Sequence, residues 1–173
     1  MPLMFLLVPL FLALMLAPAR ADVVTDALNG AIAAYDRAGP SLPAIQFGVD
    51  TAAYRDALVM GRFTSPHWNE PLVLDLREGD AGGACARFAA HVILPPQNGA
   101  VTLVLCPQFV QTGTPALRTL TILHEMVHAV AGPDECRAMA FAAHVEQLAT
   151  GTHTPVDRYW SANNCAGSGF SLP

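Results

Sequence analysis

Residues 114–133 predict one helix whose two ends are both marked in the sequence. Thr114 is a favourable N-cap, and Pro115 suits the first helical turn, where its missing N–H is not needed. Gly132 followed by Pro133 is typical of a helix end. Between these residues, apolar side chains recur every three or four positions, at Leu117, Leu120, Leu123, Val127 and Val130. This period predicts a helix with one deeply buried face.

The same helix contains the run His124-Glu125-Met126-Val127-His128. Residues four apart lie on the same helix face, so His124 and His128 can present two imidazole nitrogens to one metal ion. The pattern H-E-x-x-H is typical of Zn²⁺ sites in which the glutamate is the general base. We therefore expect one zinc ion per chain, bound by His124 and His128, with Glu125 taking a proton from the attacking water. The alternative is an ordinary amphipathic helix with two histidines on its polar face.

A catalytic zinc site needs three protein ligands, so one more His, Glu or Asp must lie near the two histidines. The Gly-Pro corner turns the chain back and brings the start of the next helix, predicted from residue 134 to about 148, close to the metal. Glu135 is our preferred third ligand, because its longer side chain reaches past the first turn. Asp134 remains open, although an Asp at a helix start also interacts favourably with the helix dipole. His144 lies on the opposite helix face from Glu135, roughly 13 Å farther along the axis, and cannot share the metal.

The N-terminus is typical of a secretory signal peptide over residues 1–21. Leu3 to Leu16 form an apolar core, and Ala19-Arg20-Ala21 is a small-x-small cleavage site before Asp22. An uncleaved membrane anchor is the alternative, but it needs about 20 apolar residues, and two prolines interrupt a run that is already short. We expect a secreted or periplasmic protein with no stable membrane insertion after cleavage.

Cleavage would leave residues 22–173, a length that suits a single domain with a hydrophobic core. The chain has no lysine; it contains nine arginines and 14 acidic residues. The signal peptide contains only Arg20 among charged side chains, so its loss changes the formal charge from −5 to −6. This balance argues against nucleic acid or an anionic membrane as a partner.

Four cysteines in an exported chain usually form two disulfides. Cys85 and Cys106 bracket a predicted hairpin, so we pair these two, and Cys136 then pairs with Cys165. Cysteines as metal ligands are the alternative, but the chain has no C-x-x-C spacing. Disulfides favour an oxidising compartment, in agreement with export.

Helical and strand-like periods are both present outside the two-histidine helix. A helix packed across a sheet is predicted over residues 22–38, and a shorter helix over residues 52–60. Strand-like runs cover residues 44–49, 71–76, 87–94 and 101–105. Asn98-Gly99 is a strong hairpin signal between the last two runs, and the tail 152–173 looks irregular. The expected fold class is α+β: an N-terminal helix, a small twisted mixed sheet, the two-histidine helix and a ligand-bearing helix.

His124–His128 followed by Glu135-Cys136-Arg137-Ala138 resembles the zincin metallopeptidases of gluzincin type, in which a second helix gives a glutamate ligand to the metal. Residues 132–141 are similar to an uncharacterised family of small secreted bacterial H-E-x-x-H proteins. The segment Val101–Val110 is similar to the one before the corresponding helix in the deuterolysin-like aspzincins. The resemblance covers residues 101–148. It implies a zincin-like fold and a zinc peptidase that acts on a peptide or protein substrate.

We therefore expect hydrolysis of a peptide bond, with zinc held by two histidines and Glu135 and with Glu125 as general base. Strand 101–105 would bind an extended substrate if it lies at a sheet edge. Further candidates are Arg137 for a substrate carboxylate and, for a hydrogen bond to the oxyanion, His153, Arg158 and Tyr159. Two other functions fit the same residues: a non-catalytic zinc-binding envelope protein with a closed four-ligand site, and a zinc hydrolase of another amide or ester bond.

Overall fold

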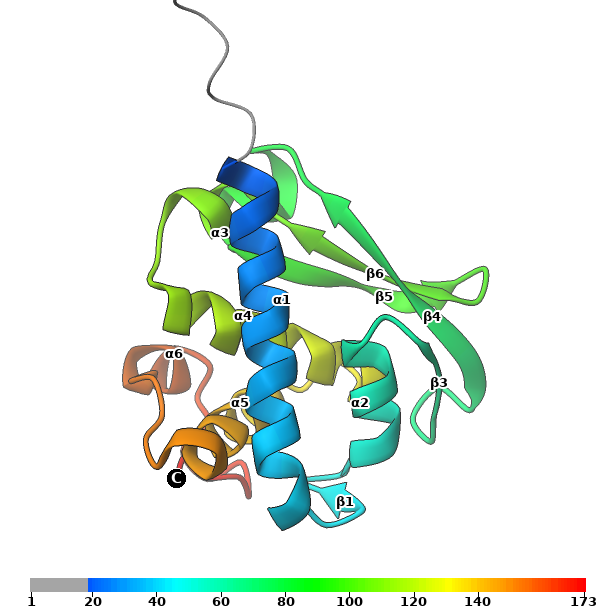
Figure 1. Cartoon of the computed structure of the whole chain (residues 1–173), viewed down its shortest axis with the longest axis vertical. Helices are drawn as coiled ribbons and strands as arrows, with labels where there is room; N and C mark the ends of the chain where they lie inside the picture. The colour runs from blue at the N-terminus through cyan, green and yellow to red at the C-terminus, as the bar shows by residue number, and fades with distance from the viewer. Residues whose placement is uncertain (1–18) are drawn as a thin grey trace, which may run out of the picture.

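The computed structural model describes residues 19–173, whose elements form an α+β fold with a small mixed sheet (Figure 1). The sheet has four strands in the order β3-β4-β6-β5. β4 and β6 are parallel, whereas β3 pairs antiparallel with β4, and β5 antiparallel with β6. The strands are Arg62–Ser65 (β3), Glu70–Glu78 (β4), Ala90–Gln97 (β5) and Ala100–Leu105 (β6). The expected α+β class with a small mixed sheet is confirmed.

Four helices pack against one another: α1 (Ala19–Ala38), α2 (Thr51–Leu58), α4 (Pro115–Ala131) and α5 (Glu135–Thr150). Of these, α2 and α4 make the main contacts with the sheet. α4 is the central one, because it contacts α1, α2 and α5 as well as β5 and β6. Every residue of α4 from Ile122 to Ala131 is consequently buried. The predicted caps of this helix, Thr114 and Gly132, are both observed.

α1 crosses α4 (Figure 1) and contacts both α4 and α5, and the prediction that it lies across a sheet is wrong. Small buried side chains on one stripe of α1 explain this packing, since alanines let two helix axes approach closely; they are Ala27, Ala31, Ala34 and Ala38. The predicted signal peptide, residues 1–21, lies outside the described residues except for its last three, which belong to the start of α1.

β5 and β6 form the predicted hairpin around Asn98-Gly99. Both turn residues have positive φ, 53° and 74°, as a two-residue hairpin turn requires. β5 runs on to Gln97, with a register shift after Ile93, so it is displaced toward the turn relative to the predicted strand 87–94. It begins at Ala90 because residues 83–86 form a 3-10 turn.

β6 lies between β4 and β5, so the prediction that strand 101–105 forms a sheet edge is wrong. The hydrogen-bonding positions on both sides of β6 are used, because β4 pairs with it in parallel after the chain has crossed over. β5 and β3 are the two edge strands of this sheet.

Several short elements differ from the sequence prediction. The predicted strand 44–49 is a small hairpin of β1 (Ile45–Gln46) and β2 (Val49–Asp50), because Phe47 and Gly48 have positive φ and reverse the chain. The strand β3 was not predicted. Neither was α3 (Pro107–Gln111), nor α6 (Asp157–Ala162) in the tail that was expected to be irregular. Both helices are too short to show a helical period in the sequence.

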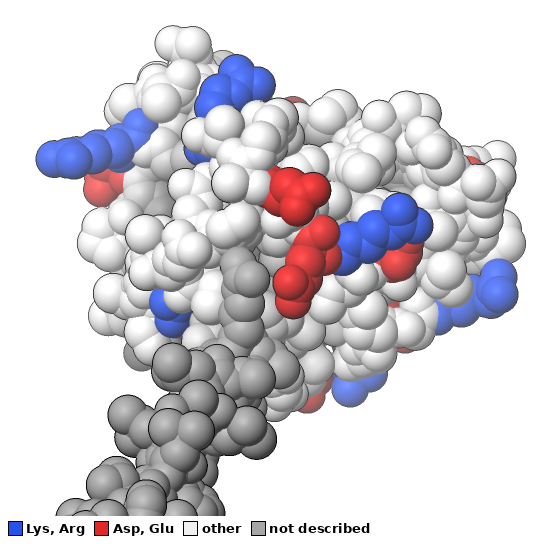
Figure 2. Space-filling view, turned by 90° about the horizontal axis from the view of Figure 1, so that it is seen from above, with Lys and Arg blue, Asp and Glu red and all other residues white. Residues whose placement is uncertain are grey.

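Two disulfides join the predicted pairs, Cys85–Cys106 and Cys136–Cys165. The first lies in a small cluster with Val104, apart from the main core, and the second ties the start of α5 to the segment after α6. Both are consistent with an oxidising compartment. Among residues 19–173, no helix is long and apolar enough to span a bilayer. On the face shown in Figure 2, arginines and carboxylates are scattered among uncharged residues.

Candidate metal centre

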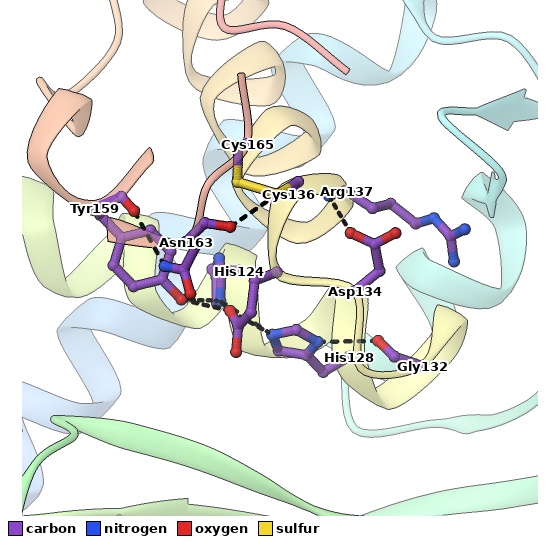
Figure 3. Close-up of polar contacts among 10 residues, drawn as sticks. His124, His128, Gly132, Asp134, Cys136, Arg137, Tyr159, Asn163 and Cys165 are labelled. Atoms are coloured by element: carbon purple, nitrogen blue, oxygen red, sulfur yellow. Dashed lines mark hydrogen bonds and ion pairs between the residues drawn. A yellow bond between two sulfur atoms is a disulfide. The ribbon is translucent and has the colours of Figure 1, made fainter. Parts of the chain in front are cut away.

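The side chains of His124 and His128, from α4 (Figure 3), meet that of Glu135 at the start of α5. The two Nε2 atoms are 3.0 Å apart, and Glu135 Oε2 lies 3.1 Å from Nε2 of His124 and 3.3 Å from Nε2 of His128. Tetrahedral ligands with bonds of about 2.0–2.1 Å stand roughly 3.3 Å apart. The three atoms therefore have nearly the mutual spacing of three ligands on one zinc ion.

The turn between α4 and α5 decides which acidic residue reaches the histidines. α4 ends at Ala131, and Gly132 takes a positive φ of 85°, which turns the chain back. Asp134 is the N-cap of α5, and its carboxylate accepts a hydrogen bond from the backbone N–H of Arg137 at 3.0 Å. Glu135 is then the first helical residue. The structure thus brings Glu135 to the histidines and uses Asp134 as a cap.

Side chains from other elements hold the end of α4 in place. The carbonyl oxygens of residues 129, 130 and 131 accept hydrogen bonds from Trp68, Ser65 and Arg137, respectively. His67 packs so closely over Gly132 that a Cβ at this position would collide with its ring. The turn that places Glu135 is therefore fixed by β3, by the β3–β4 turn and by α5.

The tautomer of His128 determines whether its Nε2 atom can donate a hydrogen bond to Glu135. Its Nδ1 lies 2.9 Å from the carbonyl oxygen of Gly132, an acceptor, so Nδ1 must donate. In the neutral ring, Nε2 then has only a lone pair and faces the Glu135 carboxylate, a second acceptor. Two acceptors in contact require a cation between them, which is either a proton on Nε2, giving an imidazolium, or a metal ion. Since two imidazoles and a carboxylate are also a known catalytic zinc set, these residues fit the metal.

The pKa shifts have the signs expected of such a site. Burial of His128 disfavours the imidazolium, but its hydrogen bond to Glu135 and the charge of Glu125 outweigh burial, and the pKa of His128 is raised. Burial by itself would raise the pKa of Glu135. Hydrogen bonds from both histidines and Tyr159 outweigh it and hold that pKa well below the ordinary 4.5. The group thus stabilises a negative carboxylate beside a positive charge.

His124 is positioned by packing more than by polar contacts. Its Nδ1 atom is buried and has no hydrogen-bond partner among the described residues. The ring lies edge-on against those of His128 and Tyr159, at centroid distances of 4.7 and 5.4 Å. Of the two imidazoles, only that of His128 therefore has the backbone partner that commonly orients a metal-binding histidine.

Glu125 is buried and lines both cavities that adjoin His124, His128 and Glu135. Burial raises the pKa of its carboxyl, and the charges of His124 and His128 reduce that shift only in part. A carboxylate with a raised pKa is a stronger base than one in water, as a general base requires.

Tyr159, on α6, lies near His124 (Figure 3) and completes the polar contacts around Glu135. Its hydroxyl donates to Glu135 Oε2 and lies 3.3 Å from His124 Nε2. Burial and the neighbouring Glu135 carboxylate both raise the pKa of this phenol, so it stays protonated at neutral pH. The sequence suggested Tyr159 only as one of three hydrogen-bond donors in the tail, because its distance from the motif in the chain gives no sign of this contact.

His124, His128 and Glu135 are called the metal group below. The remaining candidate residues are not part of it. His144 is half-buried on α5 against Phe47, and Arg137 supports the turn through the carbonyl of Ala131. His153 lines a separate cavity near α1, whereas Arg158 lines the larger of the two cavities beside the metal group. A second possible ligand group, Cys85, His91 and Cys106, contains the two cysteines of a disulfide.

Two cavities flank the metal group. The larger, of about 650 Å³, adjoins His124, and the smaller, of about 130 Å³, adjoins His128 and Glu135. Four residues line both cavities: Phe88, Ala90, Glu125 and Tyr159. The two cavities therefore meet next to Glu125 and Tyr159.

No known family model matches this chain, and neither does any curated protein or solved structure. The geometry of the site is therefore the basis for a functional assignment.

Proposed function

We propose that this protein is an exported zinc metallopeptidase with a zincin-like fold. The observation that carries the proposal is the convergence of His124, His128 and Glu135 between two cavities, with buried Glu125 beside them. Two imidazoles and one carboxylate leave one position of a tetrahedral zinc ion for water or substrate. An open position next to a buried base is what hydrolysis requires and what a purely structural site lacks.

In this proposal Glu125 accepts the proton of the attacking water and passes it to the leaving amine. Its location where the two cavities meet supports this role, because the scissile bond of a substrate that spans both cavities would lie there. Zinc, when bound, would supply a Lewis acid that polarises the carbonyl and lowers the pKa of water. Tyr159 keeps its proton and can donate a hydrogen bond to the oxyanion.

The substrate would lie along β5. This strand is a free edge of the sheet, and its residues Ala90, His91, Val92 and Leu94 line the smaller cavity beside His128. An extended peptide can add to such an edge through backbone hydrogen bonds. We therefore assign the binding of an extended substrate to β5 and not to residues 101–105.

Replacement of Glu125 by Gln tests the proposal. The variant should bind as much zinc as the wild type but lose activity on unfolded protein substrate by on the order of 100-fold or more, because the proton acceptor is removed. Zinc content is measured by elemental analysis and cleavage by mass spectrometry of the products. Glu70→Gln, an exposed carboxylate at the start of β4, is the matched control. Retained activity in Glu125→Gln would contradict the mechanism.

One observation favours a second function, that of a non-catalytic zinc-binding protein. The Tyr159 hydroxyl contacts both Glu135 and His124, so it could close the site as a fourth ligand if it lost its proton to solvent when the metal binds. Tyr159→Phe separates the two functions. A peptidase should keep its zinc and lose catalytic rate, whereas a closed site should lose zinc affinity.

A further inference from the structure

The larger cavity is lined mainly by apolar residues, and apolar side chains at its border are exposed to solvent. Its buried lining comes from five elements or segments and includes Ala90, Phe109, Leu120, Met139 and Val156. At its border, Phe88 and Leu117 are 45% and 42% exposed, among the most exposed large apolar residues of the described chain. Leu117 was predicted to lie on the buried face of α4. Exposed apolar side chains around a concave apolar cavity are typical of a ligand-binding site.

Three arginines line the same cavity: Arg87, Arg118 and Arg158. None of them forms an ion pair within residues 19–173, where the arginine–carboxylate pairs are Arg55–Asp36 and Arg77–Asp75. The only acidic residues in the lining are Asp157 and Glu125. In a chain with a net charge of −5, this arginine excess suits a negatively charged group.

Arg118 is held in place although its charge is not neutralised. Its Nε and one terminal nitrogen donate to the carbonyl oxygens of Phe109 and Val110, at 2.8 and 2.9 Å. Both acceptors are neutral, so the guanidinium keeps its full positive charge while its orientation is fixed. A preorganised guanidinium loses less conformational freedom on binding a carboxylate than a free one does.

We propose that the larger cavity selects peptides with a large apolar residue next to the scissile bond and a carboxylate one or two residues farther on. The apolar side chain packs against the wall around Phe109 and Leu120, and the arginines bind the carboxylate. A volume of about 650 Å³ is that of a site for a ligand larger than one side chain, which leaves room for both groups. The inference rests on the proposed function, because it takes the neighbouring metal group as the site of cleavage.

Peptide binding to the full mature chain with Glu125→Gln tests this selectivity without turnover. Four labelled peptides of equal length are compared by fluorescence anisotropy, with Phe or Ala at one position and Glu or Gln two residues later. We expect the peptide with Phe and Glu to bind most tightly. Each single replacement should weaken binding about tenfold or more.

Two variants connect the selectivity to this cavity. Arg158→Gln should reduce the affinity for the Glu peptides and leave that for the Gln peptides unchanged. Arg158 is exposed and makes no side-chain hydrogen bond or ion pair within the described chain, so the fold does not depend on it. Arg62→Gln, an equal charge change on the distant edge strand β3, is the control. Thr121→Trp, which fills the cavity from α4, should weaken the Phe peptides more than the Ala peptides.

The outcomes separate this inference from the proposed function. Equal affinity for all four peptides, or a preference unchanged by both Arg158→Gln and Thr121→Trp, would overturn the inference even if the wild type cleaves peptides. If binding is selective and these two variants reduce the selectivity, the inference is supported, even if the wild type cleaves none of the four peptides. In that case the proposed peptidase function, and not the binding site, would be wrong.

Discussion

Asp134 and Glu135 are neighbours in the chain but have different roles in the structure. The Asp134 carboxylate accepts the hydrogen bond of an N-cap, whereas that of Glu135 lies between two imidazoles. The difference follows from helix geometry, because the cap residue directs its side chain to the open backbone N–H groups of its own helix. Each role predicts a different consequence of mutation.

Glu135→Ala should reduce zinc from about one ion per chain to a small fraction, since two imidazoles alone are a poor zinc site. Asp134→Ala should keep its zinc and lose only about 1 kcal/mol of folding free energy, the usual value of an N-cap. Elemental analysis and denaturant unfolding measure the two effects. Loss of zinc in Asp134→Ala with retention in Glu135→Ala would assign the third ligand the other way.

The metal group also predicts how the stability of the metal-free protein depends on pH. The pKa of Glu135 is lowered, so its stabilising effect is present above 4.5 and is lost as the pH falls through the lowered pKa. The pKa of His128 is raised, so its effect is present below 6.5 and is lost as the pH rises through the raised pKa. Glu125, whose pKa is also raised, acts in the same direction as His128. Glu135 and His128 together stabilise the metal-free protein most between pH 4.5 and 6.5, and the contribution of Glu125 falls as the pH rises above 4.5.

In the presence of a chelator, the Tm should therefore be lower at about pH 8 than at about pH 5.5. Added zinc should raise the Tm more at the higher pH, because metal binding requires deprotonated imidazoles. Thermal unfolding at both pH values, with chelator or with zinc, measures this. His128→Gln should flatten the dependence of the chelated protein, and an equally steep fall in that variant would exclude His128 as its cause.

At the scale of elements, the turn between α4 and α5 is the part on which the site depends most. It follows a helix whose last three carbonyl groups are held by side chains from three other segments. A small displacement of this turn would move both the Gly132 carbonyl that orients His128 and the helix start that places Glu135.

Gly132→Ala should therefore lower both stability and zinc affinity. Gly132 has a φ of 85°, and a Cβ there would collide with the His67 ring. The matched control is Gly151→Ala, at the end of α5, where φ is 79° but no atom lies within 4 Å of the added Cβ. Both variants suffer a backbone cost: about 1–2 kcal/mol for Gly151→Ala in the left-handed helical region, and more for Gly132→Ala, whose ψ of −170° is essentially restricted to glycine. Only Gly132→Ala should also lose zinc affinity, because only there does the added Cβ displace the turn. Equal zinc binding by the two variants would mean that the turn tolerates displacement.

At the scale of the whole molecule, a disulfide links the C-terminal segment to the start of α5, next to the site. Cys136 lies one residue after Glu135, and its bond to Cys165 spans 29 residues of chain, including α6 with Tyr159. Tyr159 therefore depends on two connections, its own packing and this covalent one. The other disulfide, Cys85–Cys106, lies apart from the main core.

Replacing Cys136 and Cys165 together by Ser should lower stability by about 3 kcal/mol, as expected for a bond that closes a loop of this length. It should also reduce catalytic rate more than zinc content, because α6 is freed while His124, His128 and Glu135 remain on α4 and α5. Denaturant unfolding, elemental analysis and peptide cleavage measure the three quantities. Unchanged activity in this double variant would mean that Tyr159 is held by packing alone.

Local signals in the sequence determined both ends of α4, from the Thr114 cap to Gly132, along with the spacing of its two histidines. They also determined the Asn98-Gly99 hairpin turn and the start of α5. Such features depend on residues only a few positions apart, where helix period, capping and positive φ act directly. The cysteine pairing could be predicted as well, because one pair brackets that hairpin and leaves a single choice for the other.

Only the tertiary structure decided which groups surround the metal site. It placed Glu135 rather than Asp134 among the imidazoles, brought Tyr159 to them from α6, and made β5 the edge strand in place of β6. It also exposed Leu117 beside an apolar cavity although its helical period predicted burial. These outcomes depend on how distant segments pack against one another, and residue spacing within one segment contains no information about that.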